Sequence, residues 1–276
     1  MQLVSETCRT RENILILADF SDGNWDAIQF AMKYLYRTHS EIGIVQTWHR
    51  PNFGFSMVRD LSPILQKNAE NELETLKRKL LSSYTLSDSQ IHLFPFEGDL
   101  TAFFTSNLYA GKNWQVVMAS GEDGYQLSEN PRILEIIDKV GHSLYILSGW
   151  KGIGFRSDGF VLSDTNNPSQ QVLEALSNIT AEGKSFFRVC LNSSEQSRES
   201  TEKQKIIYRD NCRNARLLFL EAGKGNGQEE FNDFAAEKGQ RIMIFDQNRY
   251  RKFTRSLKSC LDLWLVRSKG IIIGHH

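Results

Sequence analysis

Two glycines that follow an apolar segment have the spacing of a phosphate-binding loop. Residues 114–120, WQVVMAS, lead into Gly121 and Gly124, and an amphipathic segment follows at 130–140. Glycines between a strand and a helix let backbone N–H groups approach phosphate oxygens, and the first turn of the helix adds the positive end of its dipole. This spacing therefore favours binding of a phosphate group.

The charges beside these glycines oppose that chemistry. Glu122, Asp123 and Glu129 lie in the loop, and no basic residue precedes Arg132. Carboxylates repel a triphosphate unless a divalent metal intervenes. Two interpretations stay open: a phosphate cradle that has lost much of its affinity, and a vacant loop with a structural role.

No catalytic or metal-binding motif accompanies the loop. The six histidines lack metal or triad spacing, and there is no H-E-x-x-H, G-x-S-x-G or complete Walker pattern. Ser120 has no identifiable base beside it, so we do not assign a nucleophile. The cysteines are scattered without a C-x-x-C pair, which indicates buried or idle thiols: Cys8, Cys190, Cys212 and Cys260.

Apolar strand-like runs alternate with segments of helical period, which indicates β-α-β units around a parallel sheet. The predicted strands are 13–19, 42–48, 90–96, 114–120, 143–147, 160–164, 186–191, 215–221, 241–246 and 270–274. The predicted helices lie near 24–39, 62–83, 100–110, 130–140, 168–182, 198–212, 227–238 and 254–267. The 62–83 helix has the clearest pattern, with Ser62 as N-cap and Pro63 in the first turn.

The element order repeats after a Gly-rich joint at 151–159. LADFSDGNWDAI (17–28) aligns with LSDTNNPSQQVL (162–173) without a gap, which places Asp19 over Asp164. Self-similarity of this kind indicates a tandem duplication. We predict one domain at 1–150 and a shorter, degenerate copy at 151–276, with the loss between its second and third strands.

At this point the motifs resemble those of universal stress proteins. The stretch ILADFSDGNWDAI is similar to the start of such domains, FEGDL to the family's glycine after the third strand, and Ser120-Gly121-x-x-Gly124 to its fourth-strand loop. The resemblance implies an α/β fold of two tandem, doubly wound, five-stranded parallel-sheet domains of the adenine nucleotide α-hydrolase-like type. These would be related by a pseudo-two-fold axis, with ligands at the carboxyl ends of the strands.

The same resemblance implies a nucleotide site in the first domain, with ATP, ADP or AMP as ligand. The residues that match its contact positions are Asp19, Thr47, Gly98, Ser120, Gly121 and Gly124. The family pattern continues nine residues later with Gly-Ser or Gly-Thr, where this chain has Leu134 and Glu135. Asp19 also has a purely structural interpretation, as a strand-end residue that accepts N–H groups of the next turn.

The second copy keeps Asp164 but has no glycine in its fourth-strand loop, FDQNRYRKFTRSL. Its basic residues, from Arg249 to Arg255, favour either a phosphate or acidic partner at a helix start, or a solvated basic turn. The segment at 49–58, HRPNFGFSMV, lies outside the regular elements and is a candidate lid or contact surface.

Composition excludes some partners. The 33 basic and 33 acidic residues cancel, although 1–150 carries 13 basic and 18 acidic residues, leaving 20 and 15 for the remainder. A neutral chain makes no electrostatic case for nucleic acid or an anionic membrane. No apolar run approaches the roughly 20 residues of a membrane span, and the first residues do not resemble a signal peptide, so we expect a cytoplasmic protein.

The leading hypothesis is a non-enzymatic stress-response regulatory or binding protein. It would act through protein partners or self-association, with weak adenine-nucleotide binding in its first domain. A nucleotide-dependent hydrolase or transferase on the same fold, and a ligand-free interaction scaffold, are the alternatives.

Overall fold

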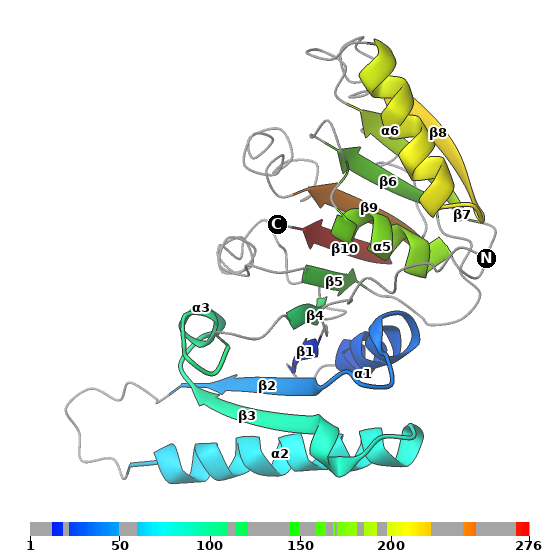
Figure 1. Ribbon diagram of the computed structural model, residues 1–276. Coiled ribbons are helices and arrows are strands. Elements are labelled where there is room, and N and C mark those ends of the chain that lie inside the picture. The colour runs from blue at the N-terminus through cyan, green and yellow to red at the C-terminus, as the bar shows by residue number, and fades with distance from the viewer. Residues whose placement is uncertain are drawn as a thin grey trace.

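The structure is a computed structural model (Figure 1). It describes residues 13–18, 22–49, 60–109, 114–120, 144–148, 158–163, 168, 170–180, 185–191, 198–221, 240–246 and 269–275. The helices predicted near 130–140, 227–238 and 254–267 lie outside the described residues.

Ten strands form one continuous sheet. They are β1 (Asn13–Leu17), β2 (Ile42–Trp48), β3 (Ile91–Glu97), β4 (Trp114–Ser120), β5 (Leu144–Ser148), β6 (Asp158–Ser163), β7 (Ser185–Leu191), β8 (Ala215–Glu221), β9 (Gln240–Asp246) and β10 (Lys269–His275). Each lies within two residues of its prediction, because strands buried on both faces appear in a sequence as apolar runs. The predicted parallel-sheet α/β class is confirmed.

The strand order is β3-β2-β1-β4-β5-β10-β9-β6-β7-β8. All neighbouring strands are parallel except β5 and β10, which pair antiparallel. The first five strands and the last five follow the same order from the outer edge to this seam. In the first half the order reverses between β1 and β4, and such a reversal opens a crevice at the carboxyl ends of the strands.

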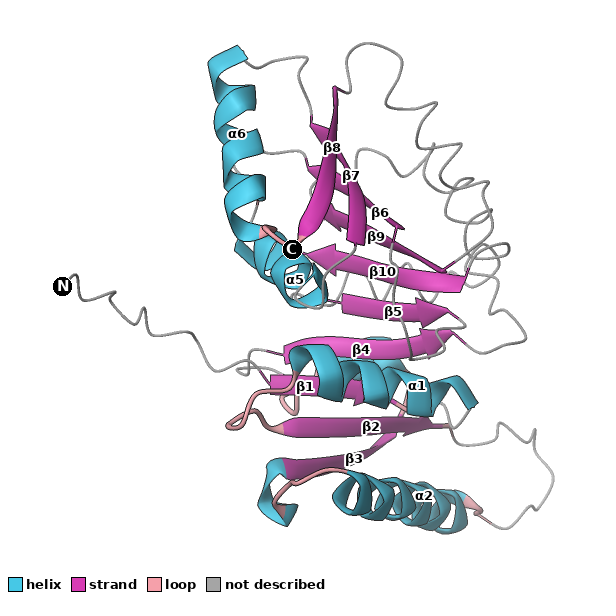
Figure 2. Ribbon diagram, turned by 90° about the vertical axis from the view of Figure 1, so that its right-hand side faces the viewer, coloured by secondary structure: helices cyan, strands magenta, loops and turns pink. Residues whose placement is uncertain are grey.

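Helices cover both faces of the sheet. They are α1 (Asp22–Phe30) with the π-helical turn η1 (Ala31–Leu35), α2 (Ser62–Ser83), the 3-10 turn η2 (Asp88–Gln90), α3 (Leu100–Phe104), α5 (Gln170–Thr180) and α6 (Arg198–Asn211). Buried apolar residues of α1, α2, α5 and α6 belong to one cluster with the same face of the sheet. Figure 2 shows α5 beside α6 over one half and α2 along the far edge of the other. Phe103 of α3 packs on Phe94 and Phe96 of the opposite face.

Helix α2 has the predicted bounds. Its buried stripe is Ala69, Leu73, Leu76 and Leu80, at the three- and four-residue steps that place side chains on one face. The predicted N-cap is wrong: Ser62 is the first helical residue, and its N–H donates to Oδ1 of Asp60 at 3.0 Å. Asp60 therefore takes over the acceptor role that the sequence assigned to Ser62.

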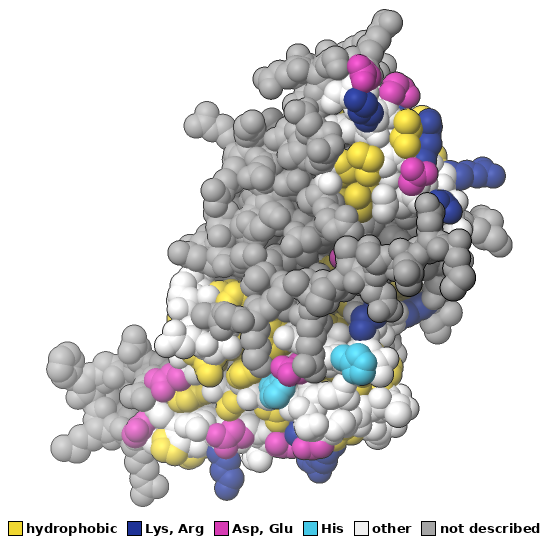
Figure 3. Space-filling model, viewed as in Figure 1, with side chains coloured by type: hydrophobic (Ala, Val, Ile, Leu, Met, Phe, Trp, Pro, Cys, Tyr) yellow, Lys and Arg dark blue, Asp and Glu magenta, His cyan; other side chains and the backbone are white. Residues whose placement is uncertain are grey.

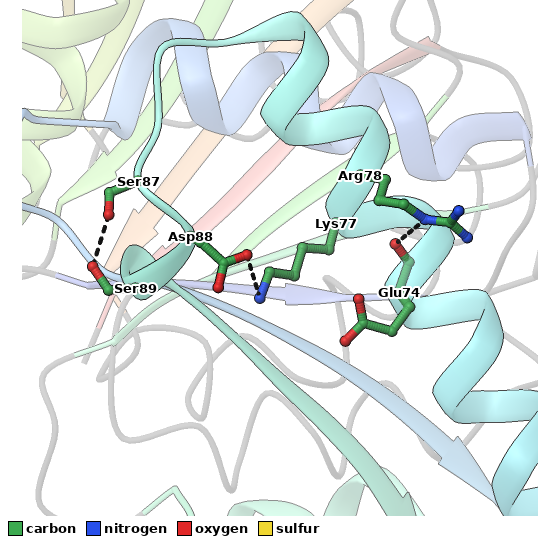
Figure 4. Close-up of polar contacts among 6 residues, drawn as sticks. All are labelled: Glu74, Lys77, Arg78, Ser87, Asp88 and Ser89. Carbon is green, nitrogen blue, oxygen red and sulfur yellow. Dashed lines mark hydrogen bonds and ion pairs between the residues drawn. The ribbon is translucent and has the colours of Figure 1, made fainter.

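Polar contacts hold the carboxyl half of α2 against the turn that precedes β3 (Figure 4). Nζ of Lys77 lies 2.9 Å from Oδ1 of Asp88 in η2. The hydroxyls of Ser87 and Ser89 are 2.7 Å apart, and Ser87 N–H donates to Oε1 of Gln90. An ion pair with one exposed partner contributes less than about 1 kcal/mol to the free energy of unfolding. These contacts therefore mainly orient the turn between α2 and β3.

Two predicted helices end earlier than expected. The 24–39 helix is α1 followed by η1, where Tyr36 N–H donates to Ala31 O across five residues. The 100–110 helix stops at Phe104, because the hydroxyl of Thr105 donates to the carbonyls of Thr101 and Ala102. Hydroxyls that bond nearby carbonyls compete with the next helical turn.

A glycine on β2 lets two aromatic rings meet across the strand. A Cβ atom added to Gly43 would lie 2.9 Å from Cδ1 of Leu15 and 3.0 Å from the rings of Phe94 and Trp114. Those rings pack edge-on with centroids 6.4 Å apart. The contact joins β3 to β4 over two intervening strands, near the amino ends of β2 and β4.

We predict that Gly43→Ala lowers the free energy of unfolding by about 1–3 kcal/mol, because an added methyl group must displace packed rings. Urea unfolding followed by circular dichroism measures the loss. Ser83→Thr adds one methyl group at an exposed position of α2 and serves as the control. Equal stability of the two variants would contradict the packing described for Gly43.

Two of the four cysteines are described, and both are buried thiols outside any disulfide, as predicted: Cys190 on β7 and Cys212 after α6. Burial raises the pKa of the Cys212 thiol to about 11. Because only the thiolate reacts with disulfide reagents, the folded protein protects this group.

In a variant with Cys8→Ser and Cys260→Ser, we expect almost no labelling by a disulfide reagent at pH 8. Two thiols should react after unfolding in guanidinium. The raised pKa of Cys212 also predicts that its contribution to stability is complete below pH 9 and is lost as the pH rises toward 11. Rapid labelling of the folded variant would show that these thiols are accessible.

Candidate functional site

The carboxyl ends of β3, β2, β1 and β4 form one edge, where the sequence placed the ligand. Leu17 of β1 lies between Val45 of β2 and Met118 of β4 in the register. Thr47 follows Val45 by two residues and Ser120 follows Met118 by two, so the two backbones lie at the same height along the sheet. The structure thus brings these two predicted site residues to the same edge, on either side of β1.

Gly98 joins this edge through its backbone. It has φ +130°, a conformation that residues with a Cβ atom rarely adopt, and its N–H donates to Trp48 O at 2.9 Å. An added Cβ would lie 3.1 Å from the ring of Phe96. The chain turns at Gly98 with a positive φ and is bonded there to the end of β2, which explains why this position is a glycine.

Asp99 follows and begins α3. Its Oδ1 accepts the N–H of Ala102 at 2.7 Å, the arrangement of a helix N-cap. Because this carboxylate is already bonded to the helix start, Asp99 fixes the start of α3 directly after the Gly98 turn.

The other predicted site residues, Asp19, Gly121 and Gly124, lie outside the described residues, as do Asp164 and the basic turn at 249–255. The described chain reaches Ala18 on one side of Asp19 and Ser120 beside Gly121. Ala18 N–H donates to Val45 O at 2.8 Å, which continues the β1–β2 pairing up to the residue before Asp19.

Sequence reasoning missed three polar residues at this end: Asn24 in the first turn of α1, and Gln46 and Trp48 on β2. Asn24 Oδ1, Gln46 Oε1 and Trp48 Nε1 are buried without a hydrogen-bond partner in the part of the chain that the structure describes. Nε2 of Gln46 donates to Oε2 of Glu72 on α2 at 2.6 Å. Polar residues at the end of an otherwise apolar strand were the available signal.

Among the described residues, no group of three or more His, Cys, Asp or Glu side chains could hold a metal ion. In the same ranges, no helix combines the length and the apolar character that a membrane span requires. Burial raises the pKa of Tyr109, which packs against Phe104 with ring centroids 4.9 Å apart.

A mostly parallel sheet with helices on both faces and a reversal of strand order is the architecture of the doubly wound α/β proteins. No protein-family model and no curated protein matches this chain. Among solved structures, it is similar to the crystal structure of a universal stress protein from Archaeoglobus fulgidus DSM 4304. The TM-score is 0.60 at 12% sequence identity, over 95% of each chain. The chain has the fold of a universal stress protein.

We predict that Gly98→Ala destabilises the protein by about 1–3 kcal/mol, because a side chain at this φ is strained. Denaturant unfolding measures the change. Asn107→Ala, at an exposed position after α3, should be nearly neutral. If Gly98→Ala were as stable as this control, the turn would not require a glycine.

Proposed function

We propose that this protein is a non-enzymatic stress-response regulatory or binding protein of the universal stress type, with weak adenine-nucleotide binding in its first half. The observation that carries the proposal is the shared edge at the carboxyl ends of β1, β2 and β4, on a fold similar to that of a universal stress protein. The residues that would contact the nucleotide are Asp19, Thr47, Gly98, Ser120, Gly121 and Gly124.

We also propose that the chain consists of two related domains, 1–150 and 151–276. The equal strand order in the two halves supports a duplication. The starts of β7 and β2 differ by 185 − 42 = 143 residues, and those of β8 and β3 by 215 − 91 = 124. The shortening therefore falls between the second and third strands, where α6 has 14 residues and α2 has 22. The antiparallel β5–β10 pair would lie on the pseudo-two-fold axis.

Protein partners or a second copy of the chain are the proposed targets, and nucleic acid and membranes are not. Figure 3 shows acidic and basic side chains interspersed along α2, whose exposed residues include Glu70, Glu74, Arg78 and Lys79. A surface of mixed sign does not provide the basic stripe that phosphate backbones require.

The test is the thermal melting shift of the full chain with millimolar ATP, ADP and AMP, with and without magnesium. A ligand at about 100 times its Kd stabilises the folded state by about 2.7 kcal/mol. We expect a measurable shift that Asp19→Ala abolishes. Asp164→Ala, at the aligned position of the second half, should retain it.

The absence of any shift in the wild type would overturn nucleotide binding and leave an interaction scaffold as the function to pursue. Turnover of ATP that Asp19→Ala removes would instead overturn the non-enzymatic assignment.

A further inference from the structure

Three buried polar atoms are unpaired at the carboxyl end of the first half of the sheet: Asn24 Oδ1, Gln46 Oε1 and Trp48 Nε1. The Asn24 side chain is almost fully enclosed, with 3% of the residue exposed. Gln46 and Trp48 are half-buried residues whose unpaired atoms are covered. Removing a polar group from water without a partner is unfavourable, so folded proteins pair nearly all such groups. Folding stability does not explain these three.

The three residues share one face of the sheet. Alternation along β2 places Gln46 and Trp48 on the face of Ile42 and Ile44, which pack in the cluster under α1 and α2. Asn24 lies one helical turn before Ala27 and Ile28 on the buried stripe of α1. All three lie at the end where β1 and β2 finish and α1 begins.

Two amide side chains near the amino ends of β1 and β3 have partners. Asn13 Oδ1 accepts the N–H of Glu41 at 3.2 Å. The Gln90 amide donates to Tyr36 Oη and to the carbonyls of Thr38 and Ser40. Asn24, Gln46 and Trp48 lie instead at the carboxyl end, where doubly wound folds bind ligands.

The chemistry of these atoms selects the ligand. The Glu72 carboxylate only accepts hydrogen bonds, so the Gln46 NH₂ group must face it and Oε1 faces away. Gln46 and Asn24 therefore offer carbonyl acceptors, and Trp48 offers one N–H donor. Hydroxyl and amino groups of a ligand match two acceptors and a donor. Phosphate oxygens, which only accept and are negatively charged, do not match them beside Glu72.

We propose that Asn24, Gln46 and Trp48 recognise the neutral nucleoside part of the ligand, its sugar hydroxyls and base amino group, so that the phosphates add little affinity. This inference rests on the proposed nucleotide binding. Three carboxylates also lower the affinity for the phosphates, because they repel a triphosphate. They belong to Glu122, Asp123 and Glu129, in the Gly121–Gly124 loop and its continuation.

Isothermal titration of the full chain with adenosine, AMP and Mg-ATP tests the proposal. For the wild type we expect the three Kd values to agree within about threefold, because the phosphates contribute little. Trp48→Phe removes the N–H donor together with part of the indole ring, so all three Kd values should rise about fivefold. Trp114→Phe, on the opposite face of the sheet, is the matched control and should leave each Kd unchanged.

The outcomes separate this inference from the function on which it rests. Mg-ATP binding more than about tenfold tighter than adenosine would overturn the inference and assign the affinity to the Gly121–Gly124 loop. Wild-type Kd values for Trp48→Phe would also overturn it, since the donor would then be irrelevant to the ligand. No binding of any of the three compounds to the wild type would overturn nucleotide binding itself.

Discussion

The antiparallel pairing of β5 with β10 makes one sheet of the two halves of the chain. Ile146 lies opposite Ile272, and the register continues to both ends of β5. The pairing joins two sets of five strands that otherwise share no strand neighbour. Because each of these strands pairs with the other, their hydrogen-bonding edges are used within the chain, and β3 and β8 become the outer strands.

The apolar core crosses this seam and makes the two halves interdependent. Tyr145 of β5 is buried, and its ring centroid lies 5.7 Å from that of Phe30 at the end of α1. Helix α5 contacts η1, and Val172 and Leu176 belong to the same buried cluster as Ala31 and the other residues of that turn. The wider π-helical turn therefore lies where one half meets the other. No glycine or proline occurs in the turn.

Packing and hydrogen bonding act on different parts of the first half of the sheet. On one face, Gly43 lets the rings of Phe94 and Trp114 meet near the amino ends of β2 and β4. On the other face, at the carboxyl end of β2, Gln46 is held by Glu72 through its NH₂ group, while the enclosed Oε1 has no hydrogen-bond partner. A polar group that is already oriented needs no reorganisation when a ligand binds.

The element types could be predicted from the sequence, because each is encoded locally. The NILIL run of β1 is buried at every position, and the stripe from Ala69 to Leu80 has helical spacing, so both were predictable. The repeated element order also placed Thr47 and Ser120 at strand ends. Three features became visible only in the folded chain: the pairing of β5 with β10, the π-helical turn, and the unpaired atoms of Asn24, Gln46 and Trp48. These depend on neighbours far apart in the chain, and the spacing of residues along a sequence carries no information about which distant atom becomes a partner.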